Sequence, residues 1–86
     1  MKIAVIGIII NGDRSIAEEV NKILSSFGDY IVCRMGVPDR VNNIYVISII
    51  VKAELEVISS LSGKLGKLKS VVVKSAITSV EKIENK

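Results

Sequence analysis

Two segments of the chain are apolar at odd and even positions alike, and this pattern restricts the fold more than any other feature. They are Ile3 to Ile10 and Ile44 to Val51. Because successive side chains of a strand point to opposite faces, both segments predict strands that are hydrophobic on both faces. Only two helices are expected elsewhere, enough to cover one face of a small sheet. The other face therefore needs a partner, and we expect that partner to be another copy of the chain.

The composition indicates one small domain with an aliphatic core. Of the 86 residues, 49% are hydrophobic but only 3% are aromatic. Proteins that read single-stranded nucleic acids stack bases on aromatic side chains, and here only Phe27, Tyr30 and Tyr45 exist. The net charge of +3 is small, with both signs interspersed. Direct nucleic acid binding is therefore not expected.

The chain has one cysteine, Cys33, and no histidine. An internal disulfide is impossible, and no ordinary zinc, nickel or copper cluster can form within one chain, so neither a metal nor a cofactor is predicted. The segment Ile3 to Ile10 is too short to span a bilayer, and no small-residue cleavage site follows it. A reducing, cytoplasmic setting is expected.

The first half of the chain predicts strand, helix and strand. After the turn Asn11 to Arg14, Ser15-x-x-Glu18 has the form of a capping box, and apolar residues at helical spacing predict a helix from about Ile16 to Phe27, stopped by a left-handed Gly28. Tyr30 to Gly36 reads as a second strand. Pro38-Asp39 favours a type I turn, in a loop completed by Asn42 and Asn43.

The second half repeats the pattern. The strand from Ile44 is followed by a helix over about Leu55 to Leu65, without a strong cap and ended by Gly66, and by a strand at Val71 to Ile77. Residues 1–78 thus form one domain, and residues 79–86 are expected to be a polar tail. Strand, helix, strand, strand, helix, strand is the order of a ferredoxin-like α+β sandwich. It has a four-stranded antiparallel sheet, with the first and third strands in the centre and two helices on one face.

Alternation along the strands assigns side chains to the two faces of this sheet. If Ile31, Cys33 and Met35 point toward the helices, Arg34 points to the open face, and Cys33 is a small buried hydrophobe. Lys74 also leaves the helical side. We expect a homodimer or tetramer through the open face. Arg34 and Lys74 would border that interface, either holding a small anion between subunits or simply reaching water.

Two segments are candidates for ligand-binding loops. Asn11, Gly12, Asp13 and Arg14 lie between a strand end and a helix start, where backbone amides can hold an anion. Alternatively, Gly12 makes the turn and Asp13 or Ser15 caps the helix. The segment Ser62 to Lys69 lacks the spacing of a phosphate loop and reads as a helix stop. The carboxylates form no recognisable pair, so no catalytic residue is predicted.

Several segments together resemble the iron-only hydrogenase system regulator family, over about residues 2–78. They are Gly7-Ile8-Ile9-Ile10, Arg34-Met35-Gly36-Val37-Pro38, Ile47-Ser48-Ile49-Ile50-Val51, Ser62-Gly63-Lys64-Leu65-Gly66-Lys67-Leu68 and Val73-Lys74-Ser75-Ala76. The resemblance implies an ACT-like version of the ferredoxin-like fold, related to the sensing domain of the nickel-responsive repressor, and no catalytic activity. Without histidine, the nickel site of that repressor cannot be carried over.

The leading hypothesis is a non-enzymatic regulatory module that oligomerises through its sheet and senses an amino-acid-like ligand between subunits. The alternative is a transcription-regulatory subunit acting by protein or DNA contact through Lys64, Lys67, Lys69 and Lys74. Acylphosphatases share this fold class, and Arg14 and Asn42 are present, but the glycine-rich loop of those enzymes is missing. An enzyme is therefore not expected.

Overall fold

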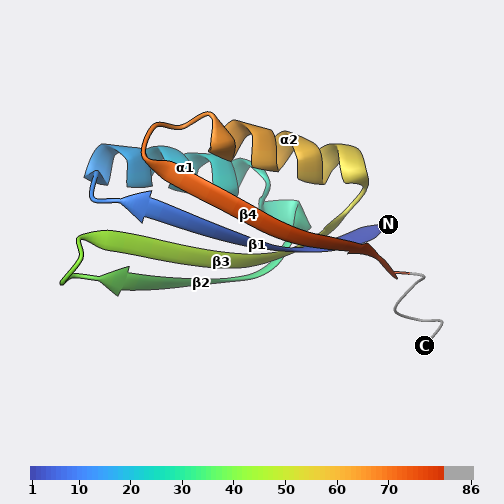
Figure 1. Cartoon of the computed structure of the whole chain (residues 1–86). Coiled ribbons are helices and arrows are strands. Elements are labelled where there is room, and N and C mark those ends of the chain that lie inside the picture. Colours follow the sequence, from blue (N-terminus) through green and yellow to red (C-terminus); the bar gives the residue numbers. More distant parts are fainter. Residues whose placement is uncertain (81–86) are drawn as a thin grey trace.

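A computed structural model describes residues 1–80 of the chain (Figure 1). The elements follow in the predicted order: β1 (Lys2–Asn11), α1 (Arg14–Ser26), a 3-10 turn η1 (Gly28–Tyr30), β2 (Ile31–Asp39), β3 (Ile44–Ala53), α2 (Leu55–Gly66) and β4 (Val71–Ser79). Neither helix, at 13 and 12 residues, is long and apolar enough to cross a bilayer.

The four strands form one antiparallel sheet in the order β2-β3-β1-β4. Both helices lie on the same face (Figure 1). The two strands that are apolar throughout, β1 and β3, are therefore central, as predicted. The core consists of one side-chain set from each of them together with the inner faces of the helices: Ala4, Ile6, Ile8, Ile10, Val20, Leu24, Ile47, Ile49, Val51, Ala53, Ile58, Leu61 and Leu65.

Helix α1 begins earlier than predicted because Asp13, not Ser15, is its N-cap. The Asp13 carboxylate accepts a hydrogen bond from the Ser15 amide at 2.9 Å and from the Ser15 hydroxyl at 2.7 Å. The capping-box interpretation of Ser15 and Glu18 is therefore wrong. Gly28 is also not a left-handed stop, since Gly12 is the glycine with positive φ among the described residues. The helix instead tightens into the 3-10 turn η1.

Strand β2 differs most from the prediction. It runs through Pro38 and Asp39, which were expected to form the turn. Because β2 is an edge strand, a proline without an N–H is tolerated there. The turn lies at residues 40–43, where the Asp39 carboxylate accepts from the amide and side chain of Asn42, at 3.2 and 2.9 Å.

A β-bulge in β2 reverses the predicted orientation of its side chains. Ile31 pairs with Val51, but Cys33 pairs with Ile50, so Val32 is an extra residue. An extra residue moves every following side chain to the opposite face. The expectation that Cys33 is buried is wrong, because its side chain is exposed. Arg34 correspondingly lies on the helical side of the sheet, opposite the buried Ile49.

Strand β4 continues to Ser79, two residues beyond its predicted end. The Val80 amide donates to the Met1 carbonyl at 3.2 Å, which holds this end of β4 beside the start of β1. Residues 81–86 of the expected polar tail lie outside the described residues.

Candidate functional site

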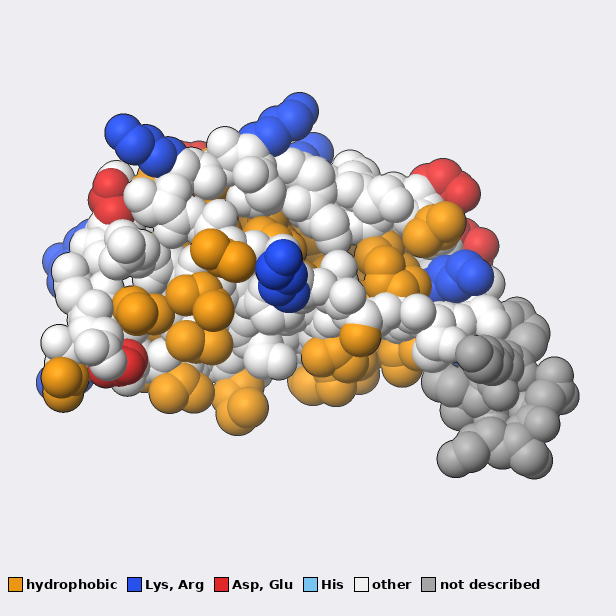
Figure 2. Space-filling model, viewed as in Figure 1, with side chains coloured by type: hydrophobic (Ala, Val, Ile, Leu, Met, Phe, Trp, Pro, Cys, Tyr) orange, Lys and Arg blue, Asp and Glu red, His pale blue; other side chains and the backbone are white. Residues whose placement is uncertain are grey.

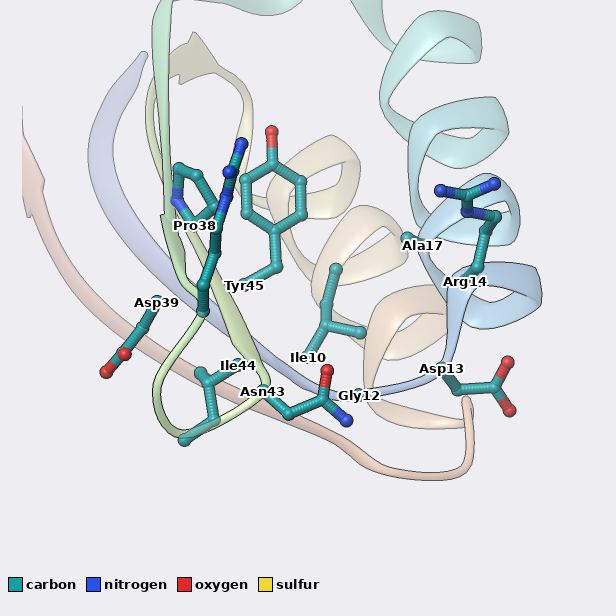
Figure 3. A pocket seen from close by; sticks show the side chains of 11 residues that line it. Ile10, Gly12, Asp13, Arg14, Ala17, Pro38, Asp39, Asn43, Ile44 and Tyr45 are labelled. Atoms are coloured by element: carbon teal, nitrogen blue, oxygen red, sulfur yellow. The ribbon is translucent and has the colours of Figure 1, made fainter.

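A cavity of about 300 Å³ lies at one end of the sheet, between the start of α1 and the β2–β3 hairpin. Figure 3 shows Arg14 on the helix side, and Pro38 and Tyr45 on the opposite wall. The complete lining is Ile10, Gly12, Asp13, Arg14, Ala17, Pro38, Asp39, Arg40, Asn43, Ile44 and Tyr45. The volume is at the small end of the range for ligand pockets.

The loop after β1 can reach the hairpin only because residue 12 is a glycine. Its φ of +66° is in the left-handed region, and an added Cβ would lie 2.5 Å from Nδ2 of Asn43. Asn43 itself has a φ of 55°. The wall behind Tyr45 depends on a second glycine, because a Cβ at Gly36 would collide with the Tyr45 hydroxyl. Close backbone approach at both glycines therefore shapes the cavity.

The carboxylates of the two acidic residues at the cavity accept hydrogen bonds from nearby residues of their own turns. The Asp13 carboxylate points outward (Figure 3), where the hydrogen bonds from the Ser15 side chain and amide lower its pKa. The Asp39 carboxylate also points away, and hydrogen bonds from the Asn42 side chain and amide lower its pKa. Both groups are stabilised as anions, but neither is directed at the centre of the cavity.

The two arginines at the cavity, unlike the two carboxylates, are not engaged by neighbouring residues in the part of the chain that the structure describes. Within residues 1–80, neither Arg14 nor Arg40 has a hydrogen-bond or ion-pair partner. A guanidinium has five donors and binds carboxylates in a bidentate manner. The cavity thus combines free cationic donors at its rim with the apolar side chains of Ile10, Ala17 and Ile44. It can hold a small anion that has an apolar part.

The cavity brings together part of the predicted ligand set. Gly12, Asp13 and Arg14 line it, and Asn11 directly precedes them, whereas Arg34 and Lys74 do not line it. Arg40 and Tyr45 were missed. A turn arginine carries no positional signal in the sequence, and Tyr45 was assigned only to an apolar strand. Predicting the hairpin turn at residues 40–43 would have placed Arg40 near the loop after β1.

Arg34 and Lys74 lie on opposite faces of the sheet, contrary to the prediction that both border the open face. Nη2 of Arg34 donates to Oδ1 of Asn21 in α1 at 2.8 Å. Lys74 pairs with Gly7 and is exposed on the open face, as predicted. The lysines of the alternative hypothesis are separated too, since Lys64 lies 5.4 Å from the ring centre of Phe27, on the helical side.

The open face of the sheet is the second candidate surface. Figure 2 shows hydrophobic side chains gathered along the side of the molecule that the sheet forms. Five large side chains on this face are between 42% and 64% exposed: Val5, Ile9, Met35, Val37 and Val72. A contiguous apolar patch of this kind on a small domain is often an interaction surface.

The strand order and the one-sided helical layer define the chain as an ACT-like domain of the ferredoxin-like class. The ACT domain of GTP pyrophosphokinase from Chlorobium tepidum superimposes with a TM-score of 0.72 at 18% identity, over 86% of this chain and 96% of that one. The chain belongs to the TM1266-like family, described as "Iron-only hydrogenase system regulator, putative", whose model matches residues 2–75.

Two further structures are similar. The protein TM1266 from Thermotoga maritima is 31% identical and has a TM-score of 0.86, over 90% of this chain and 98% of that one. The protein CPII from Thiomonas intermedia, solved with ADP, AMP and acetate, is 17% identical with a TM-score of 0.55, over 90% of this chain and 86% of that one. The second likeness concerns the fold alone. No curated protein sequence matches the chain.

Proposed function

We propose that the chain is a non-enzymatic regulatory module that binds a small amino-acid-like carboxylate in the cavity beside Gly12 and associates through the open face of its sheet. Membership of a regulator family supports the regulatory role. The proposed ligand rests on one observation: the guanidiniums of Arg14 and Arg40, unpartnered within residues 1–80, lie at the same cavity as the apolar residues Ile10 and Ala17.

The ligand class follows from the size and charge of this cavity. A carboxylate would be held by Arg14 or Arg40 through charge-assisted hydrogen bonds. A short aliphatic side chain would contact Ile10 and Ala17, and about 300 Å³ has room for little more. The lining includes no serine, cysteine or histidine, and its two carboxylates, Asp13 and Asp39, are hydrogen-bonded within their own turns. These features support binding without chemical conversion.

Calorimetric titration with a panel of amino acids and short monocarboxylates tests the proposal. We expect one class of compound to bind, and Arg14→Ala to weaken binding by roughly 10-fold or more, as for the loss of a hydrogen bond to a charged group. Arg34→Ala is the matched control, because Arg34 contacts Asn21 outside the cavity. Binding to no member of the panel, or equal losses in the two variants, would contradict the proposed ligand site.

Self-association has separate support. Full burial of a valine, isoleucine or methionine side chain is worth about 1.5–3 kcal/mol, and the half-exposed side chains of the open face would gain roughly half of that each. Domains of this size have few other ways to enlarge their core. A second copy of the chain carries the same apolar face and is always present as a partner.

A further inference from the structure

The register of the sheet arranges the open face in rows that run across the strands. The central row is Met35, Ser48, Gly7 and Lys74, one residue from each strand in the order β2, β3, β1, β4. An apolar row lies on each side of it. One contains Val37, Val46, Ile9 and Val72, and the other contains Cys33, Ile50, Val5 and Ala76. The single charge in these three rows is Lys74, at the β4 end of the central row.

The size of this face suits a second copy. Strands of nine or ten residues rise about 3.3 Å per residue and lie about 4.8 Å apart, so the whole face, with the rows of Asp39 and Lys52 at its two ends, measures roughly 30 by 19 Å. Two such faces in contact would cover on the order of 1,100 Å², which reaches the lower limit for a specific interface. Pairing through the β2 or β4 edge would leave the apolar rows exposed to water.

Two symmetric ways of stacking these faces differ in the neighbour of Lys74. If the two-fold axis lies across the strands, above the central row, each strand faces its own copy and Lys74 meets the partner's Lys74. If the axis lies along the strands, between β1 and β3, then β4 faces the partner's β2. Lys74 then meets the partner's Met35, and Gly7 meets the partner's Ser48. Like charges facing each other in an interface are strongly unfavourable.

We infer that two copies stack their open sheet faces about a two-fold axis parallel to the strands, with Lys74 of each copy over the partner's Met35. The inference rests on the proposed self-association and adds its geometry. The aliphatic part of Lys74 covers the thioether of the partner's Met35, while the ammonium reaches water at the β4 edge. Packed sheets are usually rotated by about 30°, which displaces the edge strands most, and the long side chains of Lys74 and Met35 can span that offset.

Sedimentation equilibrium of the full chain, over a series of protein concentrations, tests this arrangement. The test compares a negative and a positive charge introduced at position 35. Met35 is 64% exposed, so Met35→Glu and Met35→Lys are expected to fold alike. Met35→Lys places a charge against the partner's Lys74 and should weaken association about 100-fold or more. Met35→Glu should be at least about 10-fold less harmful, and Met35→Lys with Lys74→Glu should restore association.

The outcomes separate this inference from the proposed function. A wild-type chain that stays monomeric at every concentration would overturn self-association itself, whatever the ligand titrations show. A wild-type dimer that Met35→Glu and Met35→Lys weaken equally would overturn the axis along the strands. A dimer insensitive to both would place the interface elsewhere. Leu55→Lys, on α2 and 45% exposed, is the control and should leave association unchanged.

Discussion

Gly12 and Asn43 show how single residues join two loops that are distant in the sequence. Both have left-handed backbone angles, and the side chain and carbonyl of Asn43 occupy the space that a Cβ on Gly12 would need. Any other residue at position 12 must therefore accept backbone strain and push the Asn43 side chain aside. The same contact forms part of the wall of the cavity, so a change here would affect stability and ligand binding together.

We predict that Gly12→Ala lowers the free energy of unfolding by about 1–3 kcal/mol, because the alanine would sit at a positive φ and press on Asn43. Gly63→Ala is the matched control. Gly63 is in α2, and nothing lies within 4 Å of its added Cβ. Helix propensity predicts a gain of roughly 0.5–1 kcal/mol there. Urea unfolding of both variants measures the difference, and equal effects would contradict the strain at position 12.

The N-cap residue Asp13 makes the stability of the start of α1 depend on pH. Hydrogen bonds from Ser15 to its carboxylate lower the pKa of Asp13 in the folded chain. A carboxyl with a lowered folded-state pKa contributes stability that is complete above its unfolded-state pKa. That contribution is lost as the pH falls through the folded-state pKa. Protonation also removes the charge that the N-terminus of a helix stabilises.

We therefore expect the wild-type chain to lose stability between neutral pH and pH values below the usual carboxyl range. Asp13→Asn keeps a good N-cap without a titrating group, so it should lose less over the same interval. Part of the loss should remain, because the pKa of Asp39 is lowered as well. Urea midpoints at neutral and acidic pH would decide the matter. Identical acid sensitivity in the two proteins would show that Asp13 does not contribute.

Among the elements, β1 divides its side chains most sharply between core and surface. Ile6 is completely buried under the helices, whereas its neighbour Val5 is 49% exposed on the open face. In β2, by contrast, the bulge at Val32 redistributes the side chains, and the edge position leaves most of them exposed. Alternation alone was therefore a reliable guide in β1 and failed in β2 after the first residue.

This contrast predicts different consequences for two adjacent substitutions. Ile6→Ala removes methyl groups from a closely packed core and should cost about 2–5 kcal/mol at any protein concentration. Val5→Ala should cost less in dilute solution but lower the stability gained on association, so its effect should grow with concentration. Urea unfolding at several protein concentrations tests both. A cost for Ile6→Ala no larger than that for Val5→Ala would contradict the one-sided core.

The whole molecule is a thin two-layer particle, with principal extents of 43, 22 and 18 Å. Its helical layer covers one face of the sheet, and its aliphatic composition provides more apolar side chains than that single layer can cover. Within residues 1–80, no third layer covers the open face. The regulatory proposal and the interface inference both begin from this one-sided architecture.

The order of elements, the central position of β1 and β3, and the two-faced apolar strands were readable from the amino acids. These features depend on local periodicity and on the total apolar content, and both can be read directly from the sequence. The faces taken by Cys33 and Arg34, the choice of Asp13 over Ser15 as the N-cap, and the presence of Arg14 and Arg40 at one cavity were not. Each depends on a bulge, a turn or a loop contact. These features are determined by contacts between residues far apart in the chain, because the local sequence is compatible with more than one conformation.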